Sequence, residues 1–171
     1  MKKLGPKGSK LLKSIHIIFV SIWVGGVASW LPLLFGSHVT EMGSTYLTYL
    51  SMRAIAWNVI GWGGMGSLFT GILNGIFTPW EIWKYKWVTV KFLIVSLQIL
   101  FGIFFIEKRL LENISIIETE ASSAVSNPVF LENHFWMQWG IAAQCCVFSL
   151  VIFISVWKPW GKNSKLDPKS A

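Results

Sequence analysis

The chain has 171 residues, of which 53% are hydrophobic and only 13% are charged. A soluble domain carries roughly 25% charged residues, so this composition argues against a water-soluble fold and predicts an integral membrane protein of one domain. The net charge of +7 does not indicate a nucleic-acid partner, because the lysines lie beside apolar runs, where they act as topological anchors.

Four apolar runs are long enough to cross a bilayer as helices, which takes about 20 residues each. We expect an all-α integral membrane four-helix bundle that forms a single membrane domain over residues 1–171. The first run is longer than the apolar core of a signal peptide and lacks a clean cleavage site, so it is interpreted as an uncleaved helix. The predicted spans are 12–35, 54–77, 87–106 and 135–157, followed by a polar tail over 158–171.

The distribution of charge predicts the orientation of the chain. Most of the 15 basic residues fall in the N-terminal segment, the connection between the second and third spans, and the C-terminal tail. Most of the eight acidic residues fall on the opposite side, chiefly in a long acidic connection after the third span. The positive-inside rule then puts both termini in the cytoplasm. An even number of spans agrees with this, because it requires both termini to lie on the same side.

The second span carries a face of small residues. Gly71 and Gly75 are spaced for close helix packing, and Gly61 and Gly64 extend the same surface. Tight packing against a neighbouring helix is the favoured interpretation, and room for a flat cofactor is the alternative.

Two ionisable residues lie within the spans, where such groups are costly and often functional. His16 lies about one turn past Lys13 and shares a helix face with Trp23. It can bond a neighbouring helix, ligate a haem iron through a neutral imidazole, or serve as a proton relay or substrate contact. Lys91 lies at a similar depth on the third span, with Gln98 on the same face, and can snorkel to headgroups or pair with a cofactor propionate.

The other two histidines lie at the opposite side of the predicted bilayer. His38 follows the first span and lies about 33 Å from His16 along a continuous helix, and His134 precedes the fourth span. Neither can therefore share a site with His16. They are either ordinary interfacial histidines or an outer metal or haem site in which the two rings approach each other.

The first span resembles that of the HemJ-type protoporphyrinogen oxidases and the related CopD-like membrane proteins. The similarity is carried by "LKSIHIIFVSIWVGG" and by "VKFL" in the third span. The HemJ-type branch implies a b-type haem bound through His16, with Lys91 tied to the haem and to activity. The CopD-like branch implies copper handling. The matching residues are Lys13, His16, Trp23, Gly25, Gly26, Val90 and Lys91.

Together these features predict a haem b redox protein of the cytoplasmic membrane, with His16, Lys91, Trp23 and Gln98 as cofactor-binding residues. No C-x-x-C-H motif occurs in the sequence, so the haem would be bound non-covalently. The predicted function is electron transfer, or oxidation of a lipid-soluble, quinone or tetrapyrrole substrate, in contact with the lipid bilayer and with a redox partner or in a homo-oligomer. The alternatives are copper or small-molecule transport and a non-catalytic subunit of a larger membrane complex.

Overall fold

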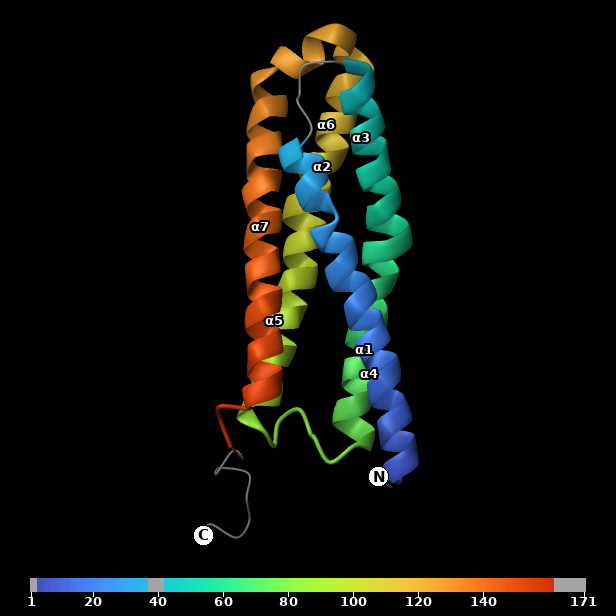
Figure 1. Ribbon diagram of the computed structural model, residues 1–171. Coiled ribbons are helices and arrows are strands. Elements are labelled where there is room, and N and C mark those ends of the chain that lie inside the picture. The colour runs from blue at the N-terminus through green and yellow to red at the C-terminus, as the bar shows by residue number, and fades with distance from the viewer. Residues whose placement is uncertain (1–2, 37–41, 162–171) are drawn as a thin grey trace.

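The computed structural model describes residues 3–36 and 42–161, and within them the chain is an all-α bundle of four long helical rods (Figure 1). Short π-helical or 3-10 segments interrupt two of the rods without ending them. The elements are α1 (Pro6–Ala28), α2 (Trp30–Gly36), α3 (Met42–Ile55), η1 (Ala56–Gly61), α4 (Trp62–Phe77), α5 (Lys86–Phe101), η2 (Gly102–Glu107), α6 (Lys108–Glu120), η3 (Ala121–Ser126) and α7 (Pro128–Trp157).

All four rods are long and apolar enough to cross a membrane, as the sequence predicts. They span 31, 35, 41 and 30 residues. The start of α1, the connection between α4 and α5, and the end of α7 lie together at one end of the bundle, which we call the basal end (Figure 1). The opposite, distal end is formed by α2, the start of α3, α6, η3 and the start of α7.

The bundle is longer than a hydrocarbon core is thick. The helix that runs from Lys86 through η2 to Glu120 has 35 residues and is therefore about 50 Å long, against about 30 Å for the bilayer interior. The acidic segment that the sequence suggested as a connection forms α6 instead. Its apolar residues recur at helical spacing and are buried, whereas Glu112 and Glu118 are exposed, which is the pattern of a helix with one face in water. Its buried apolar residues are Leu110, Ile114 and Ile117.

The helix α7 begins at a well-formed cap. The side chain of Asn127 accepts hydrogen bonds from the backbone N–H groups of Val129 at 2.8 Å and Phe130 at 3.4 Å. Pro128 occupies the first turn, where its missing N–H has no cost. This cap fixes the point at which the chain turns back from η3 toward the basal end.

The glycines of α4 allow α1 to pack directly against it. A Cβ at Gly63 would lie 2.6 Å from the backbone nitrogen of Trp23, and one at Gly66 would overlap the ring of Phe19. A Cβ at Gly71 would lie 3.4 Å from Cε1 of His16. The small-residue surface is therefore used for helix packing, the interpretation that the sequence favoured.

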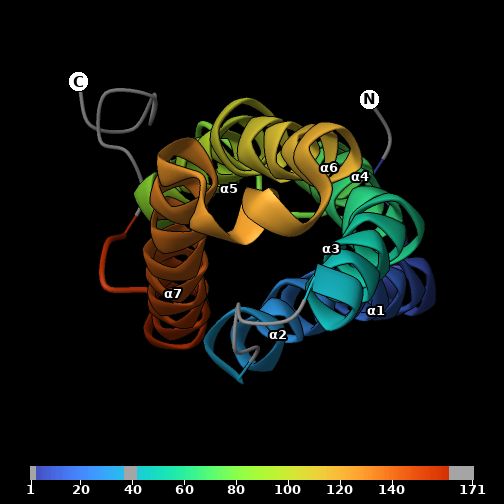
Figure 2. The same ribbon diagram turned by 90° about the horizontal axis from the view of Figure 1, so that it is seen from above.

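The best-packed core lies in the distal half. Large side chains such as Trp30, Tyr49, Met52, Phe130 and Met137 are almost completely buried there. Toward the basal end the rods separate into the pairs α1–α4 and α5–α7 (Figures 1 and 2). Trp23 of the first pair and Phe148 of the second make an edge-to-face contact, with their ring centroids 4.8 Å apart. Many large apolar side chains remain on the outer surface, and this is compatible with contact with lipid.

Candidate binding sites in the bundle

His16 is held against α4 in a defined orientation. Its Nδ1 lies 2.9 Å from Oγ1 of Thr70. The Thr70 hydroxyl donates its own hydrogen to the carbonyl oxygen of Gly66 at 2.6 Å, so it accepts from an Nδ1–H of His16. This arrangement places the ring proton on Nδ1 and leaves a lone pair on Nε2. Nδ1 and Cε1 form the ring edge that contacts α4, at Thr70 and Gly71.

A group of lysines surrounds the basal end near His16. Lys91 and Lys158 both lie against the ring of Trp87, and the ammonium group of Lys158 is 5.7 Å from its centre. Lys13 and His16 also lie close to Lys91. The ammonium group of Lys91 lies 5.4 Å from the ring centre of Trp87, and that of Lys158 lies 4.6 Å from the ring centre of Trp80.

These three lysines come from α1, α5 and the residue after α7, so the fold brings them together from distant parts of the chain. None of them has a carboxylate partner within residues 3–36 and 42–161, where the salt bridge found is Lys3–Glu81 at 3.1 Å. We call Lys13, Lys91 and Lys158 the basal lysine cluster. Its unneutralised charge suits an anionic group placed beside His16.

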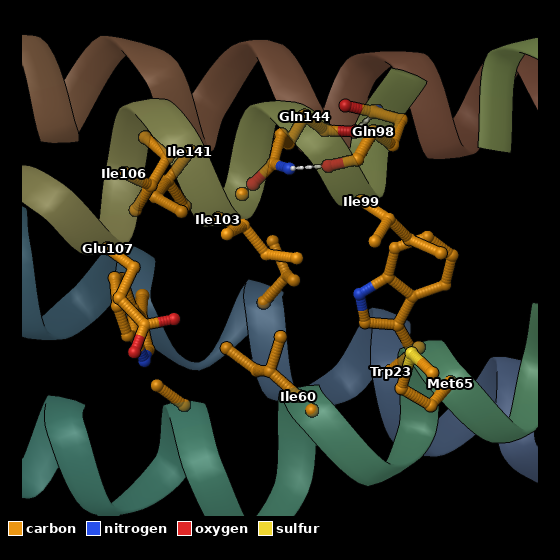
Figure 3. A pocket seen from close by; sticks show the side chains of 16 residues that line it. Trp23, Ile60, Met65, Gln98, Ile99, Ile103, Ile106, Glu107, Ile141 and Gln144 are labelled. Atoms are coloured by element: carbon orange, nitrogen blue, oxygen red, sulfur yellow. Dashed lines mark hydrogen bonds between the residues drawn. The ribbon is translucent and has the colours of Figure 1, made fainter. Parts of the chain in front are cut away.

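Trp23 and Gln98 lie in a different place from His16 and Lys91. Both line a cavity of about 110 Å³ near the middle of the bundle, which His16 and Lys91 do not line (Figure 3). The four residues that the sequence grouped as one cofactor site are therefore divided between the basal end and this central cavity.

Gln98 joins α5 to α7 through a reciprocal pair of hydrogen bonds. Its side-chain amide donates to the backbone carbonyl of Gln144 at 3.3 Å, and the amide of Gln144 donates to the carbonyl of Gln98 at 3.2 Å (Figure 3). Both side chains are buried, so each amide supplies a hydrogen bond to a polar group that would otherwise lack a partner in an apolar environment.

His134 belongs to a buried polar network at the distal end. Its Nδ1 lies 2.8 Å from the hydroxyl of Tyr49, and its Nε2 lies 3.2 Å from the carbonyl oxygen of Leu34. Since Asn113 donates to the same hydroxyl at 3.0 Å, Tyr49 donates to Nδ1 and the ring proton sits on Nε2. Both ring nitrogens of His134 are thus engaged, and metal ligation would require one of these bonds to break.

The network extends beyond the histidine. Asn133 donates to Asn113 at 3.0 Å and to Glu112 at 3.1 Å, and Gln138 donates to the Leu34 carbonyl at 2.9 Å. Sequence reasoning missed Tyr49 and Asn113, which have no distinctive motif. The helical spacing of Asn113 with the apolar residues of α6 is the one signal that would have placed it on a buried face.

The outer histidine site stays a prediction, because His38 lies outside the described residues. Within the part of the chain that the structure describes, no three His, Cys, Asp or Glu side chains gather as metal ligands. Cys145 and Cys146 are free thiols.

Comparisons with protein-family models, with curated proteins and with solved structures find no match to this chain.

Proposed function

We propose that this chain is a multi-pass protein of the cytoplasmic membrane with its basal end in the cytoplasm. Four apolar rods of sufficient length support the membrane placement. Lysines from the N-terminal segment, the connection between α4 and α5, and the end of α7 meet at the basal end, and positive charge of this kind is retained on the cytoplasmic side. The distal end, with α6, would then project beyond the outer face of the bilayer.

We further propose that the basal end binds a b-type haem through His16, in a protein of redox function. The observation that carries the proposal is the hydrogen bond between His16 Nδ1 and Thr70, because a second partner of this kind fixes the tautomer and orientation of metal-ligating histidines. Nε2 is then the nitrogen available to the iron. The haem, when bound, would supply one-electron transfer to a partner or to a lipid-soluble substrate.

The residues around His16 suit such a group in charge as well as in ligand type. The basal lysine cluster presents cations to the propionates of a haem, and Lys91 is the member whose charge reaches His16. The central cavity is not the haem site in this proposal, since its volume of about 110 Å³ is below the roughly 300–1,000 Å³ of cofactor pockets. The macrocycle would instead lie at the basal end, beside His16 and the basal lysine cluster.

Replacing Thr70 by valine tests the role of the hydrogen bond. Valine keeps the shape of threonine but removes the hydroxyl that accepts the hydrogen bond from Nδ1 of His16, so we expect haem affinity to fall about 10- to 100-fold in a titration of the purified protein. Thr119→Val is the matched control, because Thr119 is exposed and bonds only within its own helix. Equal haem affinity in Thr70→Val and the unchanged protein would refute this role.

Replacing Lys91 by methionine tests the basal lysine cluster. Methionine retains an unbranched side chain but removes the charge, so haem should bind more weakly and the loss should shrink at high salt. Lys108→Met, an exposed lysine near the middle of the same rod and about 25 Å along it from Lys91, is the control. A colourless protein, expressed with haem supplied, would contradict the haem proposal, and copper quantification by mass spectrometry would then test the copper-handling alternative.

A further inference from the structure

The central cavity lies between the two π-helical segments of the bundle. Residues of η1 and η2 form much of its wall, and residues of α1, α2, α4, α5 and α7 complete it (Figure 3). A π-helical turn widens a helix locally and is frequently found at functional sites. Here two such turns, from different rods, face one cavity.

The cavity opens toward the apolar outer surface. Met65 and Ile103 line it and are also 60% and 49% exposed, so they mark its mouth. The residues beside this mouth include Trp62 and Phe104, each 71% exposed. In a bilayer these side chains face acyl chains, so a ligand would enter from lipid rather than from water.

The interior holds polar groups that the fold itself does not satisfy. Trp30 lines the cavity and is only 2% exposed, yet its indole Nε1 has no hydrogen-bond partner within residues 3–36 and 42–161. Figure 3 shows the indole nitrogen of Trp23 and the carboxylate of Glu107 pointing into the same space. A buried donor without a partner is destabilising, and a ligand oxygen would satisfy it.

The size of the cavity limits what it can hold. Its volume of about 110 Å³ compares with roughly 150 Å³ for an engineered cavity that takes up benzene. Because this volume is below that of the benzene-binding cavity, a single ring enters only in part, with its carbonyl edge inside and its substituents extending through the mouth, and a macrocycle cannot enter. The carboxyl group of Glu107 disfavours an anionic ligand, and entry past the apolar side chains of Met65 and Ile103 disfavours any charged one, so the occupant should be neutral.

We propose that this cavity binds a neutral, lipid-soluble ring compound with an alkyl or isoprenoid chain, whose ring carbonyl oxygen accepts a hydrogen bond from the indole N–H of Trp30. The ring lies among the isoleucines of the cavity, and the chain leaves between Met65 and Ile103 into the bilayer. This site goes beyond haem binding and rests only on the membrane placement of the protein.

The test observes the indole directly. The full chain, labelled with ¹⁵N, is placed in lipid nanodiscs, and its 11 tryptophan indole resonances are recorded by NMR. Trp30→Phe identifies the Trp30 resonance by its disappearance. Decylubiquinone is then added, and decylbenzene serves as a matched compound that has the ring and chain but no carbonyl. The expected result is a downfield shift of the Trp30 resonance with decylubiquinone alone.

Two pairs of variants make the result specific to the cavity. Ala56→Leu fills the cavity and should abolish the shift, whereas Ala54→Leu, exposed on the same rod, should leave it unchanged. Trp30→Phe should bind decylubiquinone roughly 2- to 12-fold more weakly, as followed at the Trp23 resonance, because it lacks one neutral hydrogen bond. Trp57→Phe, on the outer surface, is its control.

The proposal is overturned if the Trp30 resonance does not move, if decylbenzene moves it equally, or if Ala56→Leu still shows the shift. The remaining indole resonances report whether each variant is folded. If the Ala56→Leu protein does not fold, the affinities of Trp30→Phe and Trp57→Phe for decylubiquinone are compared instead. Equal affinities of these two variants overturn the proposal.

Discussion

Tyr49 is the residue whose hydroxyl ties the distal end together, and Tyr49→Phe tests that role. The hydroxyl donates to Nδ1 of His134 at 2.8 Å and accepts from the side-chain amide of Asn113 at 3.0 Å. It therefore links α3, α6 and α7, while His134 itself bonds the Leu34 carbonyl of α2. Phenylalanine keeps the buried ring and removes only this hydroxyl.

The expected loss follows from the groups that the substitution leaves without partners. His134 Nδ1 loses its donor, and one amide hydrogen of Asn113 loses its acceptor, although the other still bonds the Phe130 carbonyl at 3.0 Å. All of these residues are buried. At about 1–3 kcal/mol for each orphaned buried group, the free energy of unfolding should fall by about 2–6 kcal/mol. The assay is denaturant unfolding in detergent micelles.

Tyr46→Phe is the matched control, because Tyr46 lies one turn away on the same helix. Its hydroxyl donates to Glu118 at 3.2 Å in an exposed position, so its loss should change the free energy of unfolding by less than about 0.5 kcal/mol. Equal stability of the Tyr49→Phe and Tyr46→Phe proteins would refute the interpretation of the distal network.

Three further predictions test other contacts. Gly63→Ala should destabilise the protein by about 1–3 kcal/mol, because the new Cβ meets the α1 backbone. Gly25→Ala, with open space around the new Cβ, should stabilise it by up to about 1 kcal/mol. Thermal unfolding in which both variants shift the stability in the same direction would refute this. Gln98→Leu should lower stability by about 0.6–2 kcal/mol through loss of one interhelical hydrogen bond, and an unchanged unfolding curve would count against it. The hydrogen bond from Lys3 holds the pKa of Glu81 below its usual range, so the link between the N-terminus and the α4–α5 connection should persist at neutral pH and be lost as the pH falls through that lowered pKa. Hydrogen exchange of residues 3–9 measures the link as protection relative to the intrinsic exchange rate at each pH, and protection that does not fall in acid would contradict it.

The sequence predicted the number of rods and the all-α bundle because hydrophobic length is a direct consequence of burial in an apolar medium. It also placed His16 just past Lys13 and identified the glycine face of α4 as a packing surface. It did not identify the partner of His16. The bond to Thr70 depends on α1 packing against α4, and the choice of neighbour among four apolar helices is made by the fit of Gly63, Gly66 and Gly71 to α1 side chains.

The distal end was the least predictable part. The acidic segment after the third span looked like a connection because charge dominated its composition, although Leu110, Ile114 and Ile117 follow helical spacing. The π-helical segments could not be predicted, since an extra residue in a helical turn arises from packing rather than from local residue preference. The central cavity, and the place of Trp23 and Gln98 in its wall, depend on those two segments.

The absorption spectrum of the purified protein, expressed with haem supplied, tests the central claim most directly. The account predicts a Soret band that shifts on reduction with dithionite, is present in the unchanged protein and is lost in His16→Ala. Ser14→Ala, an exposed substitution two residues closer to the basal end, should retain the band. A protein without a Soret band, or a His16→Ala protein whose spectrum matches that of the unchanged chain, would contradict the assignment of His16 as the haem ligand.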